Sequence, residues 1–428
     1  MKKIIPNVTD HPAVQHLGPG LITGAADDDP SGIATYSQAG AQFGYNMLWT
    51  VVFTYPLMVG IQMVSARLGF ITGKGLATNI REHFPLWVLY LVVGLLLLAN
   101  TINIAADIAA MAEALRLLAG GSAHIYSVTF GLLCLVLQIF LPYELYVRYL
   151  KWLTLALLSY VAVVMTINVP WALVIERAVW PQLSWNNDTI TMVVAVFGTT
   201  ISPYLFFWQA AQEMEDLRSN KAGTGLLPHS KDEARHHLRR IRWDTLVGMG
   251  FSNLVAFFII LSTAATLNAT GVTNIQTSAQ AAEALRPLAG EFTFLLFSLG
   301  IIGTGLLAIP VLAGSAAYAV AEAFDWQTGL DLKPYEGRRF YSIVMIATLG
   351  GVILCFTPID PMKELFYSAV INGVIAVPIM AVMMVLGTRR LVMGEYAIGS
   401  RLRWLGWLAT AVMAIAVVAM FITWPSAS

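Results

Sequence analysis

The sequence is poor in charged residues and in cysteine. Only 12% of its 428 residues are charged, about half the share of an ordinary soluble domain, which is roughly 25%. The two cysteines, Cys134 and Cys355, lie inside apolar stretches and match no metal-binding or redox spacing. The sequence also lacks a glycine-rich phosphate loop, a zinc-protease motif and a serine nucleophile elbow. These absences argue against a soluble protein, an ATP-driven pump and a membrane protease.

Most of the sequence is instead hydrophobic. It is 57% hydrophobic, with a mean hydropathy of +0.69, and apolar stretches of the length that a membrane-spanning helix requires follow one another closely. They predict about eleven spans, near residues 17–44, 46–72, 86–118, 123–141, 149–170, 189–214, 243–267, 291–324, 340–357, 362–387 and 403–424. We therefore expect an all-α integral membrane protein with a single transmembrane transporter domain over residues 1–428. Residues 1–15 are polar and no cleavage pattern follows them, so we expect no removable signal peptide.

Charge is informative only by position. The 25 basic and 25 acidic residues cancel, so the sequence indicates no nucleic-acid partner. If the spans alternate, the basic residues fall on one side of the membrane, except for Arg116, Arg177, Arg286 and Lys363. This asymmetry predicts a multi-pass protein of the plasma membrane with a cytoplasmic N-terminus and, after an odd number of spans, an external C-terminus.

The first and sixth predicted spans each contain helix-breaking residues at mid-depth. These residues are Asp29 to Gly32 in the first span and Thr199 to Pro203 in the sixth. Discontinuous helices at corresponding positions in two halves indicate a transport site between inverted repeats, near the middle of the bilayer. We therefore predict two five-helix repeats, residues 17–170 and 189–387, with an extra span at 403–424.

Three consecutive carboxylates, Asp27, Asp28 and Asp29, precede Pro30 in the first span. A carboxylate at this depth is costly unless it faces water, a partner or an ion. Together with the carbonyls freed by the break, it would make a site for a hard cation. The alternative is that one of these residues simply caps the second half-helix, which begins at a proline.

Further oxygen donors lie in three other spans. Thr199, Thr200 and Ser202 place hydroxyls beside Pro203, although hydroxyl bonds that relieve a proline kink would explain them equally. The third span carries polar side chains on one helical face, which would line a wet path or bond to neighbouring helices. They are Asn100, Asn103 and Asp107. In the tenth span, Asn372 and Gly373 interrupt an apolar run.

Several of these residues resemble motifs of the Nramp family of divalent-metal transporters. The matching segments are residues 18–20, Asp29 to Gly32, residues 39–45 and residues 65–69 with Thr72-Gly73. Thinner likeness continues through Asp107, residues 198–203 and Arg338-Arg339. The resemblance implies a LeuT-type inverted-repeat fold with an eleventh transmembrane helix, and alternating access for a divalent cation. Convincing motif identity covers about the first sixth of the chain, whereas the expected topology agrees throughout.

The departures from the family pattern concern the ligands. The family's first-span motif reads Asp-Pro-Gly-Asn, so Asp29 keeps the carboxylate while Gly32 stands in place of an amide ligand. The sixth-span motif ends Met-Pro-His, and Ser202 replaces its thioether. Thr199 takes the place of an alanine that coordinates metal through its carbonyl, which survives the exchange. Ala110 and Tyr204 stand where proton-relay residues are usual.

These changes favour a different metal. Thioether ligands suit softer transition metals, whereas oxygen ligands and retained water suit Mg²⁺. The pattern resembles the Nramp-related magnesium transporters, a branch of the family. We therefore expect import of largely hydrated Mg²⁺, and also of Mn²⁺, without proton coupling. The candidate metal ligands are Asp29, Gly32, Thr199, Ser202, Asp28 and Asn372.

Other functions remain as alternatives at this point. A proton-coupled Mn²⁺ or Fe²⁺ importer would acidify vesicles as metal enters, and an organic-solute permease on the same fold would bind a substrate through the hydroxyls of Thr199 and Ser202. No catalytic constellation accompanies the carboxylates, so we do not expect an enzyme. The expected partners are the divalent cation and the lipid bilayer. We expect a monomer that needs no cofactor.

Overall fold

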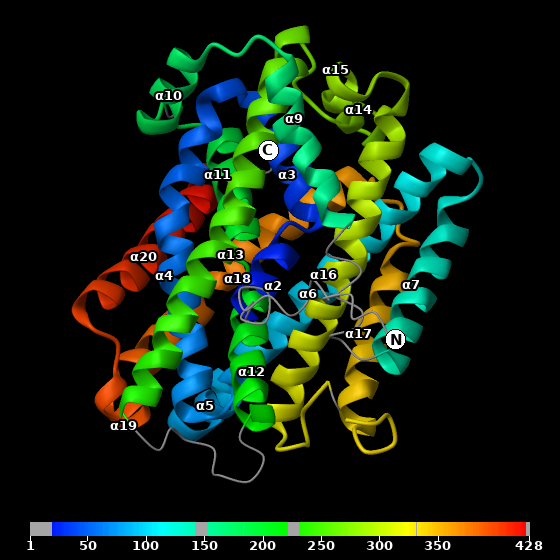
Figure 1. Cartoon of the computed structure of the whole chain (residues 1–428). Coiled ribbons are helices and arrows are strands. Elements are labelled where there is room, and N and C mark those ends of the chain that lie inside the picture. Colours follow the sequence, from blue (N-terminus) through cyan, green and yellow to red (C-terminus); the bar gives the residue numbers. More distant parts are fainter. Residues whose placement is uncertain (1–18, 142–152, 183, 221–230, 331, 425–428) are drawn as a thin grey trace, which may run out of the picture.

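The computed structural model describes residues 19–141, 153–182, 184–220, 231–330 and 332–424. Helices form almost all of this part, and it contains no strand (Figure 1). The α-helices are α2 (Pro19–Asp27), α3 (Pro30–Phe43), α4 (Leu48–Thr72), α5 (Leu76–His83), α6 (Leu86–Ala119), α7 (Ala123–Phe140), α9 (Leu158–Thr166), α10 (Trp171–Val179), α11 (Asn187–Thr200), α12 (Pro203–Asn220), α13 (Lys231–Thr266), α14 (Ser278–Ala282), α15 (Arg286–Ala289), α16 (Thr293–Ala323), α17 (Arg338–Leu354), α18 (Pro361–Thr388), α19 (Arg390–Met393) and α20 (Ser400–Thr423). Short 3₁₀ turns are η2 (Gly44–Met47), η3 (Leu153–Leu157), η4 (Asn268–Thr270), η5 (Glu283–Leu285), η6 (Gly290–Phe292) and η7 (Gly394–Tyr396).

The all-helical fold class is confirmed, but the number of spans is not. Within the described residues, 8 helical stretches are long and apolar enough to cross a membrane. The predicted first two spans join through α3, η2 and α4 into one stretch, residues 30–72. The predicted ninth span corresponds to α17, which has only 17 residues. The predicted fifth span begins outside the described residues. The N-terminal segment, residues 1–18, and Lys151 also lie outside them.

The basic connections gather at one end of the bundle. Helix α5, the end of α12, the start of α13 and helix α19 lie at the lower end in Figure 1, while α10, α14 and α15 lie at the upper end. Arg177 belongs to α10 and Arg286 begins α15, so these two bases lie opposite the basic connections. The one-sided distribution of charge is therefore visible in these elements. Its assignment to the cytoplasmic side remains a prediction.

The two predicted helix breaks are present at the centre of the bundle. Helix α2 ends at Asp27 and α3 begins at Pro30. Proline has no backbone N–H, and the first position of a helix does not require one. Helix α11 ends at Thr200, Ile201 leaves the helical conformation (φ −115°, ψ 62°), and α12 begins at Pro203. Each break thus places free backbone groups beside a proline. Figure 1 shows α2 and α3 surrounded by other helices.

Glycines allow the half-helices to pack closely on their neighbours. A Cβ atom at Gly24 of α2 would collide with the Gly248 backbone of α13. On α11, a Cβ atom at Gly198 would collide with the backbone of Ala369 and Gly373 in α18. These two contacts fix the depth at which α2 and α11 lie beside their neighbours.

Alanine at Gly24 should therefore destabilise the protein. Overpacking of this kind costs about 1–3 kcal/mol, so we expect Gly24→Ala to lower the melting temperature of the purified protein. The matched control is Gly94→Ala on α6, where nothing lies within 4 Å of the added atom and alanine favours a helix. Equal melting temperatures for Gly24→Ala and Gly94→Ala would contradict the close packing of α2 on α13.

Candidate metal site

The carboxylate of Asp29 lies in the break between α2 and α3. Its Oδ1 accepts a hydrogen bond from the backbone N–H of Gly32 at 2.7 Å, which caps α3. The residue is only 2% exposed. The cap that the sequence offered as an alternative is therefore real, but it uses one oxygen atom. A carboxylate has several acceptor sites, so capping does not prevent Asp29 from also binding a cation or its water.

The break in α11 and α12 faces this carboxylate. A Cβ atom at Gly32 would lie 3.1 Å from Oγ1 of Thr199 and 3.4 Å from Oδ1 of Asp29. The hydroxyl and the carboxylate thus both lie close to the same glycine, as does Cε2 of Tyr36 at 3.4 Å from the added atom. The predicted juxtaposition of the two breaks is present, and Gly32, which has no side chain, allows them to approach closely.

Ser202 lies in the second break, and its hydroxyl bonds to the preceding turn. It is placed to donate to the carbonyl of Thr199 at 2.7 Å or to that of Gly198 at 3.0 Å. Thr200 likewise donates to the carbonyl of Val196 at 2.6 Å. The hydroxyl bonds to the preceding turn, which the sequence analysis gave as an alternative explanation of these residues, are therefore observed. A hydroxyl that donates keeps its lone pairs, so the Ser202 oxygen can still face a cation or water.

Asp27 and Asp28 face α13 through one shared side chain. The hydroxyl of Ser252 lies 2.6 Å from Oδ2 of Asp27 and 3.0 Å from Oδ1 of Asp28. The remaining oxygens, Oδ1 of Asp27 and Oδ2 of Asp28, are buried without a hydrogen-bond partner among the described residues. Sequence reasoning missed Ser252, because nothing in the sequence links it to the first span. This contact makes an indirect role for Asp28 more fitting than direct coordination.

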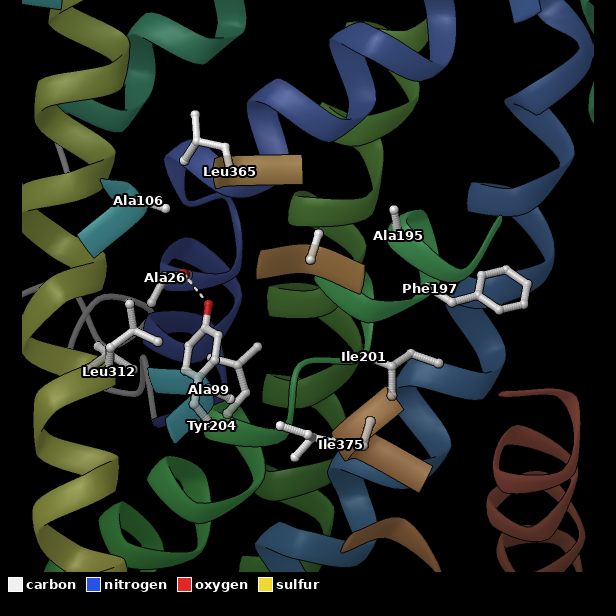
Figure 2. Close-up of a cluster of buried hydrophobic side chains, with 14 of the residues drawn as sticks. Ala26, Ala99, Ala106, Ala195, Phe197, Ile201, Tyr204, Leu312, Leu365 and Ile375 are labelled. Carbon is white, nitrogen blue, oxygen red and sulfur yellow. Dashed lines mark hydrogen bonds between the residues drawn. The ribbon is translucent and has the colours of Figure 1, made fainter. Parts of the chain in front are cut away.

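Tyr204 spans the first break from α12. Its hydroxyl donates to the carbonyl of Ala26 at 3.1 Å, as Figure 2 shows. The side chain is fully buried, and buried apolar side chains surround it in the figure. The sequence marked Tyr204 only as a missing proton-relay residue. In the structure its hydroxyl is the hydrogen-bond donor for one of the carbonyls that the break frees, that of Ala26.

Helix α18 approaches the other side of the first break. Ser31 donates to the carbonyl of Leu365 at 2.8 Å, and its hydroxyl lies 2.9 Å from that of Ser368. Asn372 follows Ser368 by one helical turn and so shares its face. The side chain of Asn372 is 2% exposed, and its Oδ1 has no hydrogen-bond partner in the described structure. The amide oxygen is therefore free, on the face of α18 that contacts α3.

The site is not an acidic or histidine cluster. The described residues contain no group of three His, Cys, Asp or Glu side chains that could hold a metal ion. A cation near Asp29 would therefore depend on hydroxyls, carbonyls and water as well as on carboxylate. Such a donor set is made only of oxygen atoms, and hard cations prefer it.

The site is closed toward the end of the bundle that carries the basic connections. The backbone N–H of Gly20, in the first turn of α2, donates to Oδ2 of Asp244 on α13 at 2.7 Å. Asp27, Asp28 and Asp29 are each at most 2% exposed. A cation could therefore reach Asp29 only after helices move, which an alternating-access protein requires.

Comparisons with known proteins agree with this architecture. Residues 20–423 match the family described as natural resistance-associated macrophage protein-like, or Nramp. A divalent metal cation transporter MntH from Acidiphilium cryptum is 27% identical over 391 residues, which cover 89% of this chain and 84% of the relative. The protein of the same name from Deinococcus radiodurans is 27% identical over 415 residues, covering 94% and 88%.

Solved structures share the fold. The Eremococcus coleocola manganese transporter superposes with a TM-score of 0.73 at 17% identity, over 96% of this chain and 88% of that one. Mhp1, a nucleobase-cation-symport-1 family transporter, gives 0.59 at 12% identity, over 95% and 92%. These neighbours have the Nramp and LeuT-type folds. The relatives are transporters, so the expectation that the chain is not an enzyme is confirmed. With the family matched along nearly its whole length, the chain belongs to the Nramp family.

Proposed function

We propose that this protein imports divalent metal cations, and that its preferred substrate is largely hydrated Mg²⁺, with Mn²⁺ carried as well. One observation carries the proposal. The Asp29 carboxylate and the Thr199 hydroxyl both lie close to Gly32, where the two helix breaks approach each other. The relatives named as divalent metal cation transporters support the cation class. The oxygen-only donor set supports Mg²⁺ within that class.

Each candidate residue then has a role. Asp29 supplies the main charge, while Thr199 and Ser202 contribute oxygens from the opposite wall. Asp28, bonded to Ser252, acts through water instead of touching the metal. Asn372 offers the unpartnered amide oxygen of α18. Because Mg²⁺ gives up its water reluctantly, a site with one or two nearby carboxylates and several neutral oxygens suits the hydrated ion.

The membrane arrangement follows the charge distribution. We infer that the end of the bundle with the basic connections faces the cytoplasm. Residues 17–170 and 189–387 act as the two inverted repeats, and residues 403–424 form the additional span. The protein works as a monomer in the plasma membrane and needs no cofactor. Alternating access moves the repeats around the site at Asp29.

Membrane potential should drive this transport without protons. A doubly charged ion gains about 4.6 kcal/mol per 100 mV, twice the single-charge value, which corresponds to about 10³-fold accumulation. We expect Mg²⁺ uptake into proteoliposomes to rise steeply when a potassium gradient with valinomycin makes the lumen negative. A pH dye in the lumen should remain unchanged during uptake. Acidification in step with metal entry would overturn the proposal of uncoupled transport.

A second candidate is a proton-coupled importer of Mn²⁺. The name of the structural neighbour from Eremococcus coleocola, a manganese transporter, favours it. The presence of Ala110 and Tyr204 at the expected relay positions argues against it. The internal pH measurement separates the two candidates directly. Competition of metal uptake by amino acids would instead indicate the organic-solute permease.

A further inference from the structure

Two polar side chains of α6 are completely buried and have no hydrogen-bond partner. They are Asn103 and Asp107, each 0% exposed. Neither amide atom of Asn103 and neither carboxylate oxygen of Asp107 is bonded to another described group. Leaving such groups unpaired in an apolar interior is unfavourable for an amide and more unfavourable for a charge. Together these side chains therefore indicate a ligand between them and the rest of the site.

The helix geometry shows where these side chains point. Asn100 bonds to the Leu312 carbonyl of α16 at 2.8 Å, so its face of α6 is turned to α16. Ala99 and Ala106 lie on another face, next to Tyr204 and Ala26 in the cluster of Figure 2. With 3.6 residues per turn, Asn103 and Asp107 fall on the arc between these two faces. That arc is turned toward the break between α2 and α3.

Asp107 lies next to the proposed cation site. Helix α6, which carries it, contacts α3, the helix that Asp29 caps. On the same side of α6, Pro30 lies near Gly305 of α16, which also contacts Met111. The two carboxylates therefore approach the first break from different helices. Two negative charges so placed repel each other unless a cation lies between them or one of them is protonated.

We propose that Asp107 and Asn103 bind the water shell of the transported cation. This inference rests on the proposed function, because only a cation that keeps its water presents hydrogen-bond donors all around it. The Asp107 oxygens and Oδ1 of Asn103 are acceptors and accept from those waters, while Asp29 holds the opposite side. These two side chains, which we call the α6 wall, thereby select for the hydrated ion, and Asp107 balances its second positive charge.

Cobalt(III) hexaammine provides a direct probe of this wall. Its ammine ligands do not exchange, so it presents N–H donors around a cation and can bind only through the ligand shell. We expect it to compete with Mg²⁺ uptake by wild-type proteoliposomes. In Asp107→Asn, which removes the charge and keeps the shape, the inhibition should weaken and the KM for Mg²⁺ should rise about tenfold, as for other outer-shell partners. Mn²⁺ uptake should change less.

Two further variants complete the test. Asn103→Leu keeps the volume and removes the amide, so it should raise the KM for Mg²⁺ with a smaller effect than Asp107→Asn. Glu113→Gln is the matched control on the same helix, because Glu113 is paired with Arg116 at 2.5 Å near the end of α6. It should leave the inhibition unchanged. If Asp107→Asn fails to fold, Asn103→Leu carries the test alone.

The outcomes separate the inference from the proposed function. Two results would overturn the proposed role of Asp107 and Asn103 and leave the transport of Mg²⁺ standing. The first is Mg²⁺ uptake by the wild type that cobalt(III) hexaammine does not inhibit. The second is inhibition that is as strong in Asp107→Asn and in Asn103→Leu as in the wild type. Absence of Mg²⁺ uptake in the wild type, with Mn²⁺ still transported, would remove the proposed function and the wall together. Weakened inhibition in Asp107→Asn but not in Glu113→Gln supports the inference.

Discussion

Replacement of Asp29 by asparagine should reduce metal uptake into proteoliposomes to the background level. Asparagine caps a helix as well as aspartate does, so the bond to the Gly32 N–H can persist. The variant loses only the charge that would balance a dication at the centre of the bilayer. Purified Asp29→Asn should therefore elute and melt like the wild type while it transports neither Mg²⁺ nor Mn²⁺.

The chain contains a matched control for this experiment. Asp360 also caps a helix that begins at a proline, and its carboxylate accepts from the N–H of Met362 at 2.9 Å. It lies on the surface and far from the breaks in sequence. Asp360→Asn should transport like the wild type. Uptake by Asp29→Asn equal to that of Asp360→Asn would show that Asp29 acts only as a helix cap.

Conversion of the site toward the usual family ligands should reverse the metal preference. The structure shows that asparagine at position 32 needs room, because even a Cβ atom there would lie 3.1 Å from the Thr199 hydroxyl. We therefore combine Gly32→Asn and Ser202→Met with Thr199→Ala. The added thioether favours softer metals. The ratio of Mn²⁺ to Mg²⁺ uptake should rise about tenfold, which corresponds to about 1.4 kcal/mol, and Cd²⁺ should become a substrate.

Partial variants show whether the geometry is responsible. Gly32→Asn alone should lower uptake of every metal, since its side chain meets the Thr199 hydroxyl without relief. Thr199→Ala alone should keep the preference for Mg²⁺, because the carbonyl at that position survives. An unchanged selectivity order in the triple variant would contradict the assignment of these positions as ligands.

The helix breaks could be predicted from sequence because their causes are local. Aspartate before proline at positions 29 and 30 ends one helix and caps the next, and Pro203 prevents α11 from continuing. That the two breaks lie close together could also be predicted, because discontinuous helices at corresponding positions in two halves are typical of a transport site between inverted repeats. The positions of Asp29, Gly32 and Thr199 relative to one another agree with it.

The contacts that complete the site could not be predicted in the same way. Ser252 meets Asp27 from 225 positions away, and Ser368 meets Ser31 from 337 positions away. Serines are common at helix interfaces in membranes, so no local pattern distinguishes these two. The span count is not confirmed, for a related reason. Length and hydropathy describe single helices, whereas α17 has only 17 residues and packs against α6, α7 and α16 in the bundle.

Uptake of Mg²⁺ by the reconstituted wild-type protein, in competition with Mn²⁺ and Ca²⁺, tests the central claim most directly. Mg²⁺ should enter the vesicles down the membrane potential, Mn²⁺ should compete with it, and Ca²⁺ should compete poorly, because it needs more oxygen ligands than the site provides. Uptake of Mn²⁺ that a large excess of Mg²⁺ does not reduce would contradict a site built for the hydrated magnesium ion.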